Sequence, residues 1–129
     1  MASDEASRQH AMLDYLRSMV VTRPFNTERF HAIFLDDKRS FLGDAPLGQG
    51  CSGSLTVRMR DLFAKALDLR ASALLIAHNH PSGQCRPSRF DSEATSRLRH
   101  VASALDIELL DHLIFTEDAV YSMRAGGNL

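Results

Sequence analysis

The segment from residue 71 to residue 80 constrains the fold more than any other part of the chain. It begins with the run Ala-Ser-Ala-Leu-Leu-Ile-Ala and continues directly into His78-Asn79-His80. An almost uninterrupted apolar run of this length predicts a β-strand at 71–77 that is buried on both faces. A strand of this kind lies inside a sheet that is covered on both sides.

The rest of the chain supplies the elements for such a sheet. Apolar spacing and turn residues predict helices at residues 4–21, 55–69 (opened by Thr56) and 88–105, and strands at 29–35, 40–47, 108–116 and 119–124. Gly48, Gly50 and Gly53 predict a loop after the second strand. The order α-β-β-α-β-α-β-β predicts an α/β (α+β) domain built on a mixed sheet.

Composition narrows the class of protein. The 129 residues are 44% hydrophobic, which suits one domain with its own core. A net charge of −1 gives no general attraction to nucleic acid or to an anionic membrane. The polar start, Met1-Ala-Ser-Asp-Glu, is not a signal peptide, and no apolar run has the length of a membrane span. We therefore expect a cytoplasmic protein without a membrane partner.

Two histidines and one aspartate have the spacing of metal ligands. Side chains at positions i and i+2 of a strand end point to the same side, so His78 and His80 can face one metal ion. A turn at Pro81-Ser-Gly83 then leads to a helix start at Ser88, which places Asp91 in the first helical turn. Two imidazoles and one carboxylate suit Zn²⁺, and three protein ligands leave a fourth position open, as in catalytic zinc sites.

Each half of this pattern also has a purely structural interpretation. An isolated His-x-His at a strand end is most often an ordinary surface or packing pair. Ser88-x-x-Asp91 is by itself the pattern of a helix N-terminus, with serine as the N-cap and an acid at the third helical position. The two interpretations are compatible, because a capped helix can still present its acid to a metal ion.

The combined pattern resembles a known family. His78-x-His80-x₇-Ser88-x₂-Asp91 resembles the JAMM (MPN+) metalloprotease signature in full. The runs His78-Asn-His-Pro-Ser-Gly, Pro87-Ser88, Asp111-His112-Leu-Ile and Tyr121-Ser122 are similar to the RadC branch, over a stretch from about Phe25 to Met123. The resemblance implies a JAB/MPN-type mixed sheet flanked by helices in a cytidine-deaminase-like arrangement. It divides the chain into an N-terminal helix at 1–22 and a RadC-like domain at 23–129.

The resemblance also implies roles for individual residues. Zinc would be held by His78, His80 and Asp91. Glu28 matches the family's glutamate, the general base that moves the proton of the attacking water, with Asp61 as its nearest rival. The hydroxyl of Ser88 would donate a hydrogen bond to the developing oxyanion.

Two further features of the resembling region leave alternatives open. Asp111-His112 would either support the metal ligands from behind or form a buried structural pair. Cys85 lies inside the metal loop and could approach the metal or pair with Cys51, although a free thiol is expected in the cytoplasm. Two cysteines are too few for a disulfide framework or a thiolate zinc site.

The resemblance implies a zinc-dependent metallopeptidase or isopeptidase acting on a protein or peptide, including conjugates of ubiquitin-like proteins. One alternative is a protein that associates with DNA in repair, for which the chain offers two groups of arginines: Arg86, Arg89, Arg97 and Arg99, and Arg58, Arg60 and Arg70. Helical arginines more often form a solvated face, and no aromatic interleaving accompanies them. The other alternative is a metal-free interaction module with the same fold. The oligomeric state stays open.

Overall fold

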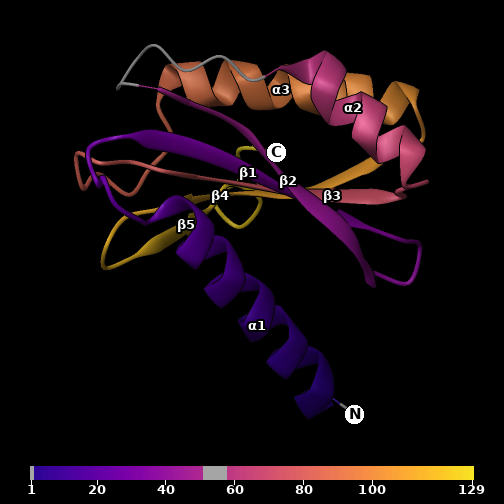
Figure 1. Cartoon of the computed structure of the whole chain (residues 1–129), viewed down its shortest axis with the longest axis horizontal. Helices are drawn as coiled ribbons and strands as arrows, with labels where there is room; N and C mark the ends of the chain where they lie inside the picture. Colours follow the sequence, from indigo (N-terminus) through magenta and orange to yellow (C-terminus); the bar gives the residue numbers. More distant parts are fainter. Residues whose placement is uncertain (1, 51–57) are drawn as a thin grey trace.

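A five-stranded sheet with helices on both faces forms the body of the protein (Figure 1). The computed structural model describes residues 2–50 and 58–129. In chain order its elements are α1 (Ala2–Val20), β1 (Glu28–Leu35), β2 (Phe41–Gly50), α2 (Met59–Asp68), β3 (Ala73–Asn79), α3 (Arg89–Ala104), β4 (Glu108–Phe115) and β5 (Val120–Ser122). This order confirms the predicted α/β fold with a mixed sheet.

The strand that carries the histidines occupies the centre of the sheet. The strand order is β2-β1-β3-β4-β5, and β3 pairs antiparallel with β1 and parallel with β4. All residues of β3 are buried except Leu75, which is half-buried, as the apolar run predicts. Because β3 and β4 are parallel, both end at the same edge of the sheet, where the backbone N–H of His80 donates to the carbonyl of Phe115 at 2.9 Å.

The larger part of the core lies between the sheet and helices α2 and α3, which cover the same face (Figure 1). The apolar faces of these helices contribute Leu62, Phe63 and Ala66 from α2 and Leu98 and Ala102 from α3. They pack against inward-pointing side chains of β1 and β3, which include Phe30, Phe34, Leu74 and Ile76. Burial of each large apolar side chain stabilises the fold by about 1.5–3 kcal/mol relative to exposure.

Helix α1 covers the opposite face of the sheet and runs beyond it at its N-terminal end (Figure 1). Its buried residues, Leu16 and Val20, pack against apolar side chains of β1, β3 and β4, whereas the side chains of residues 5–11 are exposed. Tyr15 connects the helix to β2 by donating its hydroxyl to Asp44 at 2.6 Å, and Asp44 also lies 2.6 Å from Nε2 of His31. None of the helices in residues 2–50 and 58–129 has the length and apolar character needed to cross a membrane.

The structure corrects two predicted boundaries. The second strand extends through Gly48 and Gly50, which were predicted to lie in a loop, because these residues pair with Phe30 and Glu28 of β1. Helix α2 begins at Met59 with Arg58 at its N-cap, later than predicted. The predicted cap Thr56, together with Cys51 and Gly53, lies outside the described residues.

Candidate metal centre

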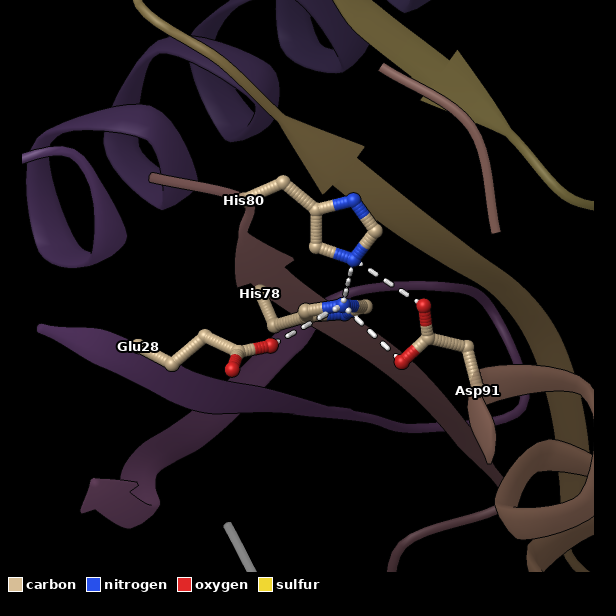
Figure 2. A group of neighbouring side chains, drawn as sticks. All are labelled: Glu28, His78, His80 and Asp91. Carbon is tan, nitrogen blue, oxygen red and sulfur yellow. Dashed lines mark hydrogen bonds and ion pairs between the residues drawn. The ribbon is translucent and has the colours of Figure 1, made fainter. Parts of the chain in front are cut away.

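Four side chains that are distant in the sequence converge at the end of β3 (Figure 2). Glu28 begins β1, His78 lies in β3, His80 follows that strand directly, and Asp91 lies in the first turn of α3. One ligand atom from each of the four lies within 4.8 Å of all the others. The structure therefore brings together all three residues predicted as metal ligands and the glutamate predicted as the base.

The shortest distances within this group join the imidazoles to the aspartate. Nε2 of His78 lies 2.9 Å from Nε2 of His80. The two oxygens of Asp91 divide between the rings, with Oδ1 3.2 Å from His78 and Oδ2 3.0 Å from His80. Oε1 of Glu28 lies 4.0 Å from Nε2 of His78, and the Glu28 side chain is only 12% exposed. Figure 2 shows Glu28 and Asp91 approaching the histidines from opposite sides.

A tight turn and a helix cap place these ligands. The chain reverses at His80-Pro-Ser-Gly83, where the N–H of Gly83 donates to the carbonyl of His80 at 3.1 Å. Gly83 adopts a φ of +86°, which a residue without a β-carbon accepts without strain. Ser88 then caps α3: its hydroxyl accepts from the N–H of Asp91, and the Asp91 carboxylate accepts from the N–H of Ser88. The helix cap expected from the sequence and the metal-ligand geometry thus occur in the same residue, Asp91.

The outer nitrogen (Nδ1) of each ring has a hydrogen-bond partner, so the inner nitrogens (Nε2), which lie next to each other, can bind a cation. Nδ1 of His80 lies 2.9 Å from the carbonyl oxygen of Gln84, which only accepts, so the neutral ring has its proton on Nδ1 and a lone pair on Nε2. Nδ1 of His78 lies 2.7 Å from Nε2 of His112, and donation in that direction leaves a second lone pair on Nε2 of His78. Two lone pairs 2.9 Å apart beside a carboxylate repel each other unless positive charge lies between them. This donor set fits a metal ion.

The pKa values of His78, His80 and Asp91 also favour binding of a cation. Burial lowers the pKa of His78, which keeps that ring neutral. Burial also acts to raise the pKa of Asp91, but the adjacent imidazoles of His78 and His80 outweigh it and hold the pKa well below its usual value. Burial acts to lower the pKa of His80, yet its hydrogen bonds to Asp91 and to the Gln84 carbonyl leave the pKa raised. The site therefore attracts positive charge.

A buried layer behind His78 fixes its ring. Nδ1 of His112 lies 2.6 Å from the hydroxyl of Thr95, which completes a chain of contacts from His78 through β4 to α3. Burial holds the pKa of His112 well below its usual value, so His112 is neutral and can accept from His78. On the other side, the ring of Phe30 stacks on the His78 imidazole at 4.4 Å with an interplanar angle of 5°.

A cavity of about 230 Å³ adjoins the site on the side of α1. It lies at the ends of β3 and β4, and its apolar wall comes from Val21, Phe25 and Phe115. His80 forms part of its lining, so the cavity borders the group of converging ligands.

The other predicted candidates lie outside the converging group. Asp61 is exposed in the first turn of α2 and lies 3.7 Å from Arg58, so the geometry favours Glu28 over this rival. Cys85 is a free thiol that donates to the carbonyl of Ile114 at 3.3 Å. Arg89 pairs with Glu93 of the same helix at 3.2 Å, as expected for a solvated helix face.

The structure separates the two members of Asp111-His112. Asp111 accepts from the backbone N–H groups of His112 and Arg124 and from the hydroxyl of Ser122, so it holds the β4–β5 connection. His112 instead contacts His78 directly. Of the two alternatives left open for this pair, contact with a predicted metal ligand applies to His112 alone, because the parallel register of β3 and β4 brings it to His78 across 34 residues of sequence.

Comparisons with known proteins agree with the geometry. A family model described as a RadC-like JAB domain matches residues 6–128. A UPF0758 protein of Rhodobacter capsulatus is 40% identical over 123 residues, covering 95% of this chain and 56% of that protein. A UPF0758 protein of Ruegeria pomeroyi is 39% identical over 119 residues, covering 92% and 52%. One of Paraburkholderia xenovorans is 37% identical over 117 residues, covering 91% and 46%. The chain thus spans about half the length of these curated relatives.

Proposed function

Because the chain belongs to the family of RadC-like JAB domains, we propose that it is a zinc-dependent hydrolase that cleaves amide bonds. The observation that carries the proposal is the convergence of Glu28, His78, His80 and Asp91 within 4.8 Å, with the Nε2 atoms of the two imidazoles 2.9 Å apart. A site that attracts positive charge and adjoins a cavity has both requirements of a metal-dependent hydrolase.

The donor set favours zinc among the common metal ions. Neutral imidazole and carboxylate are borderline-to-hard ligands, and they are the usual ligands of catalytic Zn²⁺. His78, His80 and Asp91 would hold the ion, which leaves one tetrahedral position for water or substrate. Glu28 stands farther away, with Oε1 4.0 Å from Nε2 of His78, which supports a role as the base and not as a fourth ligand.

Glu28 and Ser88 have complementary tasks in this chemistry. A bound zinc ion lowers the pKa of water and polarises a carbonyl group. The Glu28 carboxylate accepts the proton of the attacking water and returns it to the leaving amine nitrogen as the C–N bond breaks. The oxygen of the Ser88 hydroxyl accepts from Asp91, so its own proton is available to donate to the oxyanion.

We further propose a peptide or protein as the substrate, with isopeptide conjugates of ubiquitin-like proteins as one class. Amide cleavage is the chemistry of the JAMM signature that the chain carries at 78–91. The cavity beside His80 has room for one side chain of a bound polypeptide.

The first experiment is elemental analysis of the untagged chain purified without chelator. We expect about one zinc per chain in the wild type and its loss in His80→Ala. His10→Ala is the matched control, because His10 is an exposed histidine of α1 outside the converging group and should leave the zinc content unchanged.

The second experiment separates catalysis from metal binding. A screen of peptide and isopeptide substrates should reveal hydrolysis by the zinc-loaded wild type and none by Glu28→Gln, loaded at saturating zinc. Folded wild-type protein that binds no zinc would reject the proposal in favour of a metal-free interaction module. Equal hydrolysis by Glu28→Gln would reject Glu28 as the base.

A further inference from the structure

Asn79 lies between the two histidines of the site in the sequence, and its side chain forms hydrogen bonds with the backbone on both sides of Glu28. Its Oδ1 accepts from the N–H of Arg29 at 2.6 Å. Its Nδ2 donates to the carbonyl of Thr27 at 2.9 Å. Asn79 is 4% exposed, so its side chain is largely shielded from solvent. One amide thus holds the residue before and the residue after the glutamate.

The main-chain pairing of β1 with β3 ends near Glu28, which explains why a side chain supplies the next hydrogen bonds. The main-chain register of the two strands runs from Leu35 opposite Ala73 to Phe30 opposite His78, and it stops there. The backbone of His80 turns away and bonds to Phe115 of β4 instead. The polar backbone groups of Thr27 and Arg29 that face β3 are therefore satisfied by the amide of Asn79, which extends the ladder by two hydrogen bonds.

The loop between α1 and β1 is held by hydrogen bonds to Arg29, the residue that follows Glu28. The guanidinium of Arg29 donates to the carbonyls of Thr22, Arg23 and Pro24, each at 3.0 Å. Arg29 therefore joins the loop after α1 through its side chain and Asn79 through its backbone. The start of β1, including Glu28, is held on the β3 side by Asn79 and on the loop side by Arg29.

We propose that Asn79 is a positioning residue that sets the Glu28 carboxylate against the metal ligands. The inference rests on the proposed function, since it assigns Glu28 a task at a bound zinc ion. His78, Asn79 and His80 are consecutive, so the two imidazoles and the amide that holds the backbone around Glu28 move as one segment. A displacement of the loop shifts the ligands and the base together and preserves their spacing. Asn79 does not ligate the metal itself, because both of its polar atoms are engaged with backbone.

A double-mutant cycle on zinc affinity tests this inference without a substrate. The full chain is titrated with zinc against a chromophoric chelator, for wild type, Asn79→Ala, Glu28→Gln and the double variant. Loss of the Glu28 charge should weaken zinc binding on the order of tenfold, the lower end of the range for groups that support metal ligands. If Asn79 acts through Glu28, Asn79→Ala weakens binding to a similar extent, and adding Glu28→Gln costs little more.

A merely structural role for Asn79 gives a different pattern. In that case Glu28→Gln weakens zinc binding by the same factor with and without Asn79, and the proposal is overturned. Absence of any effect of Glu28→Gln on zinc binding in either background would overturn it as well. Asn26→Ala is the matched control, because it removes the amide of an exposed asparagine that is not one of the four converging residues. It should bind zinc as the wild type does.

Two additions keep the test decisive. If Asn79→Ala does not fold, the same cycle is run with Asn79→Asp, which keeps the acceptor for Arg29 and loses the donor to Thr27. Hydrogen exchange of the Arg29 amide should accelerate in Asn79→Ala, which removes its acceptor, and stay at the wild-type rate in Glu28→Gln. An unchanged rate in Asn79→Ala would show that Asn79 does not hold this part of β1. Wild type that binds no zinc defeats the proposed function and this inference together, whereas zinc binding with independent effects defeats this inference alone.

Discussion

Nδ1 of His78 lies 2.7 Å from Nε2 of His112, in the buried layer between β3, β4 and α3. Metal-binding histidines usually donate their outer N–H to a carboxylate, a backbone carbonyl or water. Here the acceptor is a second, neutral imidazole, whose own N–H is directed to Thr95. This arrangement orients His78 without placing another negative charge beside the metal centre.

Replacement of His112 should therefore weaken zinc binding even though His112 is not a ligand. His112→Leu fills most of the space but leaves the outer N–H of His78 without its acceptor. We expect zinc affinity to fall about 10- to 100-fold, measured by competition with a chelator. Thr95→Val, which touches only the far side of His112, should have a smaller effect. Wild-type affinity in His112→Leu would show that this contact does not orient the ligand.

Ser88 and Asp91 should separate helix capping from metal binding. Ser88→Ala removes the hydroxyl that accepts from the N–H of Asp91, so the zinc-free form of this variant should lose about 1 kcal/mol of unfolding free energy. The zinc content of the purified variant should equal that of the wild type. Asp91→Asn should lose zinc and remain folded. Urea denaturation and elemental analysis of both variants check the two expectations. Full zinc occupancy in Asp91→Asn would exclude Asp91 from the ligand set.

The Tyr15–Asp44–His31 group predicts how stability depends on pH at the α1 face. Burial acts to raise the pKa of Asp44, but hydrogen bonds from Tyr15 and His31 outweigh it and leave the pKa lowered in the folded protein. The stabilisation is therefore complete above the pKa of an unfolded aspartate, about 3.9, and is lost as the pH falls through the lower folded-state pKa.

The corresponding experiment compares wild type with Asp44→Asn by urea denaturation at several pH values. At pH 7 the variant should be less stable by about 1–3 kcal/mol, the range for hydrogen bonds to a charged group. The difference should shrink below about pH 4. Asp37→Asn, a change at an exposed aspartate, is the control and should show neither effect. A difference that does not vary with pH would mean that the charge of Asp44 contributes nothing.

Cys85 should be dispensable for metal binding. Its thiol is directed at the carbonyl of Ile114, and it does not belong to the converging group. Cys85→Ala should keep the zinc content and the affinity of the wild type. Loss of zinc in this variant would contradict this expectation and indicate that the thiol contacts the metal.

The sequence was most informative where the site is local. The strand, the turn and the helix start at residues 71–91 follow from apolar patterning and cap chemistry, and the convergence of His78, His80 and Asp91 could be predicted from their spacing. Glu28 lies 50 residues from His78, and resemblance to a family was needed to nominate it. For His112 the sequence left two alternatives open, support of the ligands or a buried structural pair, and the strand register was needed to bring it into contact with His78.

The error in β2 has a similar origin. Gly48 and Gly50 are typical loop residues by local preference, yet both are strand residues here. Backbone pairing with the start of β1 outweighs that preference, since an unpaired β1 would leave its polar groups exposed along one edge. Long-range pairing of this kind leaves no mark on the local sequence.

The parallel pairing of β3 with β4 also dictates when the metal ligands can meet during folding. A parallel pair cannot close through a hairpin, so it forms only after the crossover through α3 has brought distant parts of the chain together. Asp91 lies on that crossover and His112 lies on the strand that ends it. A folding chain with only its β1–β2 hairpin in place thus has no assembled site to capture an ion. If the proposed zinc ion binds here, it would bind at the end of the folding reaction and slow unfolding of the finished domain, and it would not nucleate folding.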